Sequence, residues 1–441
     1  MTIDYTPISE IPKIAAASRA SFLTHKTQSL EFRKEQVLAL QRLVLENEKE
    51  LLDAIYADLR RSPDFEIPTL TKACQNVLDN LETYTQSAKA PGLTEKDDCF
   101  VQMNPLGSVL IMGAWNFPIV LLLEPLLGAI AAGNTCVVKP SDVAQNSAKV
   151  LTRLIQKYMD PQVVFVVNGG PEESTVLLKE RFDHIFFTGG TEIGRIVMTA
   201  AAKNLTPVTL ELGGKCPAVI TRNTDIAKAA QRIAFWKTMN CGQVCLSVNY
   251  VICPKDMQEA LIQNIIGTWQ HLHGKDARTS STYPRIINQR QYTRLSKVLE
   301  AAKTQNTVVY GGKTDADDLY IEPTIVTNVS LSDEIMKDEI FGPILPIITC
   351  DDLDEAIEMI NQQEHPLNLN LFSDSKEEVE NVLRKTRSGA VTVNDISSHF
   401  GHDELPFGGV GHSGIGNYHG KYSIETFSHK RAVMVRSQAH L

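Results

Sequence analysis

Five short segments of the sequence combine residue types that can bind a ligand or do chemistry on it. They hold cysteine thiols, carboxylates, an amide, lysines and paired glycines, and they are residues 113–118 (GAWNFP), 138–142 (VKPSD), 187–194 (FTGGTEIG), 210–215 (LELGGK) and 240–245 (NCGQVC). The first four begin where a short apolar run ends, as at the end of a buried strand. Because ligands bind at the carboxyl ends of strands in open α/β sheets, the segments predict one shared site.

The elements expected to position these segments form two α/β lobes. From about Ile14 to Ala88 apolar residues recur at helical intervals, and Pro91-Gly92 ends that pattern. Short apolar runs then alternate with amphipathic stretches, which predicts parallel strands joined by right-handed crossovers. The expected strands of the first lobe are 108–112, 135–138, 163–167, 184–187 and 208–210. Those of the second lobe are 218–221, 250–253, 307–310, 344–349, 367–372 and 390–393, and a further strand is expected at 425–436.

Length, charge and composition limit the class of protein. A chain of 441 residues is longer than one domain with a single hydrophobic core usually is, which agrees with two lobes. The net charge of -9 argues against a nucleic-acid partner. The first residues lack the basic start of a signal peptide, and the most apolar stretch, 119–138, is interrupted by Glu124 and Pro125. With a polar ending at 436–441, we expect a cytoplasmic protein without an integral membrane anchor.

Two motifs match binding patterns by letter but not by context. Residues 409–414 (GVGHSG) fit GxGxxG, yet Pro406 precedes them where a strand is required, so we interpret them as a tight loop. The histidine pairs at 271/273 and 399/402 have no carboxylate or cysteine partners at ligand spacing. No metal site is therefore predicted.

Together with two later segments, the five segments resemble the aldehyde dehydrogenase superfamily. The later segments are 339–343 (EIFGP) and 405–411 (LPFGGVG), and all seven occur in the family's order. The ending, with 418–423 (YHGKYS) and 426–429 (TFSH), is especially similar to the class-three branch, which includes fatty and aromatic aldehyde dehydrogenases. The resemblance covers nearly the whole chain from Phe32 onward and implies NAD(P)-dependent oxidation of an aldehyde to its carboxylic acid.

The same resemblance implies a domain organisation. It divides the chain into a Rossmann-like cofactor-binding domain (1–90 and 105–208), an α/β catalytic domain (209–412) and a small β oligomerisation arm (91–104 and 413–441). Since this branch forms dimers, we expect a homodimer held by a projecting segment near 94–103 and a terminal strand over 426–436. Without the resemblance, the sequence fits equally well with a terminal strand that pairs with another strand of the same chain instead of with a second subunit.

By family position the nucleophile is Cys245. A thiolate adds to the aldehyde carbonyl, forms an adduct that can expel hydride, and leaves a thioester that water hydrolyses. The resemblance gives the oxyanion two donors, the side-chain amide of Asn116 and the backbone N–H of Cys245. It makes Glu211 the general base for the water, and burial beside Leu210 and Leu212 is expected to raise the Glu211 pKa.

Cys241 lies four residues before Cys245 and would share a helix face with it if the segment were helical. One interpretation makes Cys241 a second thiol that protects or inactivates the nucleophile. The interpretation that we favour is a small buried residue where the family commonly has serine.

The resemblance also implies a nicotinamide dinucleotide site. Lys139 would hold the adenosine-ribose hydroxyls, Glu339 the nicotinamide ribose, and Phe341 would pack near that ring. The glycines of 187–194 would let the backbone approach the cofactor. The expected cofactor-binding residues are Trp115, Lys139, Asp142, Gly189, Gly190, Ile193, Gly194, Leu212, Glu339 and Phe341. Asp142 stands where a longer glutamate is common, so we expect NAD as cofactor without strict exclusion of NADP.

Substrate identity is the least determined expectation. Four apolar residues, 115, 117, 121 and 122, fit either an apolar tunnel or the hydrophobic core, and the tunnel interpretation favours hydrophobic aldehydes, aliphatic or aromatic. Phe400 and His402 would lie near its mouth. Two alternatives share the fold, namely a coenzyme A-acylating enzyme and a catalytically silent structural or binding relative. The Glu211 match favours water as acyl acceptor, and the presence of both Cys245 and Glu211 argues against a silent relative.

Overall fold

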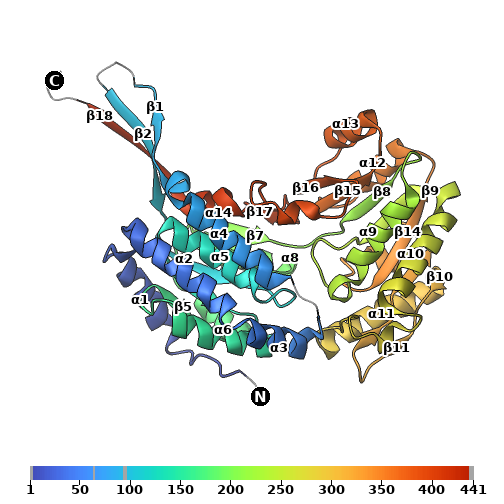
Figure 1. The fold of residues 1–441 in the computed structure, drawn as a ribbon, viewed down its shortest axis with the longest axis horizontal. Helices are drawn as coiled ribbons and strands as arrows, with labels where there is room; N and C mark the ends of the chain where they lie inside the picture. Colours follow the sequence, from blue (N-terminus) through green and yellow to red (C-terminus); the bar gives the residue numbers. More distant parts are fainter. Residues whose placement is uncertain (1–2, 63–64, 93–96, 437–441) are drawn as a thin grey trace.

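The computed structural model describes residues 3–62, 65–92 and 97–436 (Figure 1). The first part of the chain is helical, as its periodicity predicts. A proline in the first turn begins α1, and the Ser29 side chain caps α2 by accepting the N–H of Phe32. The helices are α1 (Ile11–Phe22), α2 (Leu30–Leu45), α3 (Glu48–Leu59) and α4 (Glu66–Thr85).

A six-stranded sheet forms the first lobe, in the order β17-β7-β6-β3-β4-β5. All five predicted strands are present within a residue or so of the expected bounds and are mutually parallel, whereas β17 runs antiparallel to β7. The strands are β3 (Ser108–Met112), β4 (Thr135–Lys139), β5 (Val164–Val166), β6 (His184–Thr188), β7 (Val208–Glu211) and β17 (Gly414–Ile415). The crossover helices are α5 (Val120–Ala132), α6 (Gln145–Tyr158), α7 (Pro171–Leu177) and α8 (Thr191–Ala202).

Helices bury both faces of this sheet. Along β3, Val109 and Ile111 join a core cluster shared with α2, α4 and α5, whereas Leu110 and Met112 join one shared with α1, α7 and α8. Side chains alternate between the faces of a strand, so a sheet covered on both sides needs apolar residues at every position. This explains why the runs in the sequence are continuously apolar.

A seven-stranded sheet forms the second lobe, in the order β10-β13-β14-β9-β8-β15-β16. Its strands are β8 (Pro217–Ile220), β9 (Tyr250–Pro254), β10 (Thr307–Tyr310), β13 (Thr324–Thr327), β14 (Ile344–Cys350), β15 (Asn368–Phe372) and β16 (Ala390–Val393). The expectation of parallel pairing is wrong for β10, which runs antiparallel to β13. The chain between them forms a hairpin of β11 (Thr314–Asp315) and β12 (Tyr320–Ile321) instead of a crossover helix, so it returns in the opposite direction.

The helices of this lobe are α9 (Ile226–Thr238), α10 (Gln258–His273), α11 (Gln289–Gln305), α12 (Leu353–Asn361) and α13 (Lys376–Lys385). Short 3-10 turns complete the chain at η1 (Lys26–Gln28), η2 (Met239–Gly242), η3 (Lys255–Met257), η4 (Ala277–Thr279), η5 (Glu334–Met336) and η6 (Ser398–Gly401). Within the described ranges no helix is both long and apolar enough to cross a membrane.

A three-stranded antiparallel arm projects from the body of the molecule (Figure 1). It consists of β1 (Ala88–Ala90), β2 (Asp97–Pro105) and β18 (Ser428–Arg436). The terminal strand pairs with β2 of its own chain over nine positions, from Ser428 opposite Pro105 to Arg436 opposite Asp97. It begins three residues later than expected, because α14 (Gly420–Thr426) precedes it. Parts of the predicted projecting segment and of the polar ending lie outside the described residues.

Candidate active site

The parallel register brings the predicted segments to one edge of the first sheet. Met112 at the end of β3 lies opposite both Lys139 and Phe187, and Thr188 at the end of β6 lies opposite Glu211. The segments 113–118, 138–142, 187–194 and 210–215 therefore leave the sheet together, as the sequence predicts. The fifth segment, 240–245, belongs to the second lobe and reaches this edge through hydrogen bonds with Asn116.

Asn116 is buried and joins the two lobes by hydrogen bonds. Its side-chain amide donates to the backbone oxygen of Gln243 at 3.2 Å. Its own backbone oxygen accepts from Nη1 of Arg61 at 2.6 Å and from Nδ2 of Asn240 at 3.0 Å. These bonds fix the Asn116 amide next to the turn that carries Cys245.

A buried ion pair between Arg61 and Glu66 supports the loop that carries Asn116. The Glu66 carboxylate accepts the N–H groups of Ile119 and Val120, each at 2.8 Å, at the start of α5. The Arg61 guanidinium also lies 4.4 Å from the ring centre of Phe117. Sequence reasoning missed this pair, because charges in a helical region normally lie on a solvated face.

The turn that carries Cys245 is built on Gln243, whose side chain is fully buried. Its Nε2 donates to the backbone oxygens of Asn240 and Arg285 at 3.0 Å each, and its Oε1 accepts the N–H of Ile287 at 3.0 Å. All eight cysteines are described and free; six are buried, and only Cys99 and Cys245 reach partial exposure. A nucleophile must meet its substrate, so the partial exposure of Cys245 fits that role.

Cys241 does not share a helix face with Cys245. Asn240 and Cys241 both have left-handed φ values, 46° and 55°, so the segment is no continuous helix. The Cys241 side chain is buried in the core of the second lobe, where its thiol donates to the Tyr283 hydroxyl at 3.4 Å. Burial raises the pKa of Cys241 to about 12. The structure therefore shows Cys241 as a buried residue, and its lack of a modulating role stays a prediction.

Glu211 ends β7 with a carboxylate that is only 2% exposed. Neither carboxylate oxygen has a hydrogen-bond partner among the described residues, and burial raises the Glu211 pKa well above its ordinary value. Burial also raises the pKa of the Cys245 thiol, and the nearby carboxylates of Glu339 and Glu211 contribute to that rise. The thiol and two carboxyl groups therefore lie within electrostatic reach of one another.

Lys139 and Asp142 lie together at the end of β4. The Lys139 ammonium is 3.6 Å from the Asp142 carboxylate and 3.5 Å from the backbone oxygen of Pro140. Burial lowers the Lys139 pKa, and Asp142 opposes that shift. Ile193, in the first turn of α8, is 50% exposed. The Lys139–Asp142 pair fits a ribose, and the exposed apolar side chain of Ile193 fits an adenine ring.

The glycines of residues 187–194 differ in their surroundings. A Cβ at Gly194 would lie 2.8 Å from the Leu212 side chain, and one at Gly189 would lie 2.5 Å from the ring of Phe187. A side chain at either position would therefore displace a neighbouring side chain. A Cβ at Gly190 would meet nothing within 4 Å, so that position borders open space.

Glu339, Phe341 and Trp115 come from both lobes and meet at this edge. The rings of Trp115 and Phe341 meet edge to face, with centres 5.3 Å apart. The Glu339 carboxylate packs against Gly213, where a side chain would collide with it. Burial raises the Glu339 pKa to about 8, while the backbone N–H of Gly214 opposes that rise.

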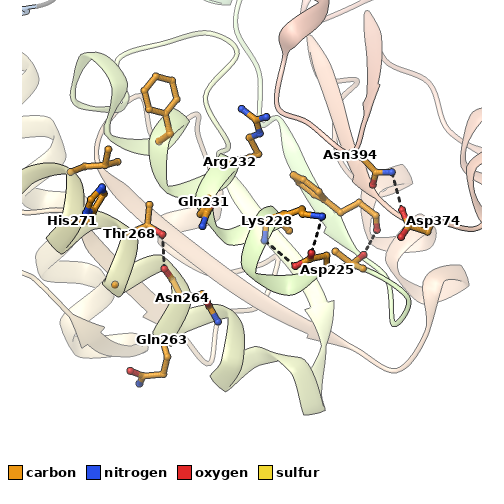
Figure 2. Close-up of a pocket in the computed structure, with 16 residues that line it drawn as sticks. Asp225, Lys228, Gln231, Arg232, Gln263, Asn264, Thr268, His271, Asp374 and Asn394 are labelled. Carbon is orange, nitrogen blue, oxygen red and sulfur yellow. Dashed lines mark hydrogen bonds and ion pairs between the residues drawn. The ribbon is translucent and has the colours of Figure 1, made fainter.

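Other expectations from the sequence concern residues that lie outside this site. Leu122 is fully buried and, with Phe117 and Leu121, belongs to the core of the first lobe, so the core interpretation holds for these three. Residues 409–414 form a tight loop with an antiparallel bridge between Gly411 and Gly414, as predicted. A groove of about 1050 Å³ lies between α9 and α10 (Figure 2), and its lining includes none of the predicted site residues.

The comparisons with known proteins agree with this geometry. The model of the aldehyde dehydrogenase family matches residues 2–433. Aldehyde dehydrogenase family 3 member A2 of Rattus norvegicus is 46% identical over 95% of this chain and 87% of its own length. The dimeric NADP-preferring aldehyde dehydrogenase of Canis lupus familiaris is 41% identical over 97% of this chain and 95% of its own length. The substrate-bound structure of Staphylococcus aureus AldH, with 38% identity, matches with a TM-score of 0.93 over 97% of this chain and 94% of that chain. This chain belongs to the aldehyde dehydrogenase family.

Proposed function

We propose that this protein oxidises hydrophobic aldehydes to carboxylic acids with NAD(P), with Cys245 as nucleophile, Asn116 as oxyanion donor and Glu211 as general base. The observation that carries the proposal is the buried Glu211 carboxylate, which has no hydrogen-bond partner among the described residues and lies within electrostatic reach of the thiol of Cys245, a partly exposed residue. A carboxylate of raised pKa can accept a proton near neutral pH.

In the first step the Cys245 sulfur forms a bond to the aldehyde carbon, and the carbonyl oxygen becomes an oxyanion. The Asn116 amide has two N–H groups, one of which binds the backbone oxygen of Gln243. The second N–H, together with the backbone N–H of Cys245, is assigned to the oxyanion. The resulting thiohemiacetal loses hydride and becomes a thioester on Cys245.

A nicotinamide dinucleotide bound at this edge would supply the acceptor for that hydride. Lys139 and Asp142 would hold the adenosine ribose and Ile193 the adenine, while Glu339 and Phe341 would hold the nicotinamide half. The open space at Gly190 and the exposed Ile193 support this assignment. Asp142 stands where a longer glutamate is common, and a relative is named NADP-preferring, so both dinucleotides are proposed.

In the last step Glu211 takes a proton from water, the hydroxide oxygen bonds to the thioester carbon, and the C–S bond breaks. The acid leaves, and Cys245 is regenerated as a thiolate. Transfer of the acyl group to coenzyme A would not need Glu211, so the buried position of Glu211 favours hydrolysis. A silent relative is disfavoured because nucleophile, base and oxyanion donor all lie at one edge.

The proposal includes a homodimer and a cytoplasmic location. Met434 and Val435 of β18 are 47% and 54% exposed on the projecting arm, which supports an apolar contact with a second copy. All eight cysteines are free, which supports a reducing compartment. We assign β7 and β17 to the cofactor-binding domain because both belong to its sheet, with the remaining boundaries near those expected.

One assay tests the proposed reaction. Purified protein is mixed with oxidised NAD or NADP and linear aldehydes of increasing chain length, and the reduced cofactor is followed by absorbance with and without coenzyme A. We expect kcat/KM to rise with chain length and turnover to need no coenzyme A. A flat or falling kcat/KM would contradict the hydrophobic substrate, and a requirement for coenzyme A would contradict hydrolysis.

A further inference from the structure

A group of buried polar side chains lies beside the candidate site and takes no part in the steps above. It consists of Glu124 on α5 and of Tyr418 and His419, which precede α14; their exposed fractions are 3%, 0% and 1%. Oε2 of Glu124, the Tyr418 hydroxyl and both ring nitrogens of His419 have no hydrogen-bond partner among the described residues. Buried polar atoms are normally satisfied by protein or by internal water. Such a group therefore indicates bound water in the interior.

The group lies on the same sheet face as Glu211. Phe186 and Thr188 of β6 lie opposite Thr209 and Glu211 of β7, so these four side chains point to one face. The Tyr418 ring packs against Phe186 with ring centres 5.1 Å apart. Burial raises the Tyr418 pKa, and the charges of Glu124, Glu211 and Cys245 add to that rise, so all three groups act on the Tyr418 hydroxyl.

Glu124 and His419 form a neutral pair. Oε1 of Glu124 lies 3.5 Å from Nε2 of His419, and the His419 ring stacks on Phe407 with centres 5.1 Å apart. Burial raises the Glu124 pKa to about 8 and lowers the His419 pKa to about 3. At neutral pH the carboxyl group is mainly protonated beside a neutral imidazole, so Glu124 can both hold and release a proton there.

Asp403 connects this pair with the surface. Its charge adds to the rise in the Glu124 pKa, and its carboxylate lies 3.9 Å from the ammonium of Lys72, whose side chain is 63% exposed. Lys72 is fixed there by a hydrogen bond to the backbone oxygen of Gly401 at 2.7 Å. The buried group is thus coupled electrostatically to the base through Tyr418 and to a partly exposed ion pair through Glu124.

We propose that Tyr418, Glu124 and His419, bridged by internal water, form a proton relay that carries the proton taken up by Glu211 to Asp403. The relay rests on the proposed role of Glu211 as base. As the Glu124 carboxylic acid releases its proton toward Asp403, it takes up the hydroxyl proton of Tyr418, whose oxygen accepts the proton that left the attacking water. No electrons are transferred, and Glu211 returns to its carboxylate form for the next turnover.

The test compares Tyr418→Phe and Glu124→Gln with Tyr320→Phe. Tyr320 is a matched control, because it is 3% exposed, its hydroxyl also lacks a partner, and it lies in the core of the second lobe. A first pulse of reduced cofactor reports acylation, and the steady rate reports deacylation. We expect normal pulses, at least a fivefold fall in kcat for the two relay variants, a larger solvent deuterium isotope effect on kcat, and partial rescue by imidazole buffer. Tyr320→Phe should keep the wild-type kcat.

A wild-type measurement covers the case in which a variant does not fold. The dependence of kcat on the deuterium fraction of the solvent should be curved if several protons move together, and a straight line would overturn the relay. Unchanged kcat and isotope effects in both relay variants would also overturn it. Glu211→Gln run in parallel separates the two proposals: if it stalls while the relay variants turn over normally, only the relay fails, whereas normal turnover of Glu211→Gln refutes the base.

Discussion

The substitution Asn116→Ala isolates the oxyanion contribution from the structural role of the same side chain. The backbone oxygen of Asn116, which holds Arg61 and Asn240, is unaffected by the change. The side chain loses its bond to the backbone oxygen of Gln243, but that oxygen keeps a second donor, Nδ2 of Asn240 at 3.1 Å. The loss in stability should therefore be small, about 1 kcal/mol.

The kinetic effect should be much larger than the effect on stability. Loss of one preorganised oxyanion donor costs about 3 kcal/mol of transition-state stabilisation, which corresponds to about a 100-fold fall in the rate of acylation. Rapid mixing with a saturating aldehyde measures that rate as the rate of the first pulse of reduced cofactor. The cofactor dissociation constant, from fluorescence titration, should stay within about twofold because Asn116 is not assigned to the dinucleotide.

A suitable control is Asn47→Ala, since Nδ2 of Asn47 also donates to a backbone oxygen, that of Leu43, but between α2 and α3. It should lose at least as much stability as Asn116→Ala, because Nδ2 of Asn47 also donates to the Tyr158 hydroxyl at 3.0 Å, and it should keep the wild-type pulse. An acylation rate within fivefold of wild type for a folded Asn116→Ala variant would refute the assignment of the Asn116 amide to the oxyanion.

Three further outcomes are expected. Cys241→Ala should keep kcat within about twofold and lower the unfolding free energy by about 1 kcal/mol in urea, because its thiol contacts a buried hydroxyl and not the site; loss of activity would revive a modulating role. Asp142→Asn should strengthen NADP binding relative to NAD in fluorescence titrations, since it removes a negative charge beside Lys139; an unchanged ratio would contradict that ribose position. Because folding raises the Glu124 pKa from 4.5 to about 8, its stabilising protonated form is fully present below pH 4.5 and lost as pH rises through 8. Urea unfolding should therefore show wild type losing stability relative to Glu124→Gln over that range, and a constant difference would contradict the raised pKa.

The sequence was most informative where the physics is local. Continuous apolar runs predict strands of a sheet covered on both faces, and most strands of both lobes follow from them. The strand β13, in which threonines flank two apolar residues, and the two-residue strand β17 were not predicted. The direction of β10 could not be predicted this way, because it depends on whether a helix or a hairpin joins it to β13. A half-exposed ribbon has no such apolar run, so only the resemblance predicts the arm strand β2, within the segment 91–104, and β1 was missed.

The candidate site likewise contains residues that the sequence could predict and residues that it could not. Residues at strand ends, such as Glu211 and Lys139, can be located because parallel strands share one edge. The side chains that hold them could not: Arg61 and Gln243 look like ordinary polar residues until the fold brings distant backbone oxygens to them. Glycine positions are also ambiguous, since Gly194 packs against the side chain of Leu212, a contact that the sequence alone does not reveal.

The most direct test of the whole account is the fate of the acyl group in Glu211→Gln. The variant is mixed with oxidised cofactor and a hydrophobic aldehyde, the reduced cofactor is counted, and the peptides are then mapped by mass spectrometry. We predict one equivalent of reduced cofactor per active site, followed by a stall, with the acyl group on Cys245 and none on Cys241. Steady turnover would contradict the role of Glu211, and an acyl group on any other residue would contradict Cys245 as the nucleophile.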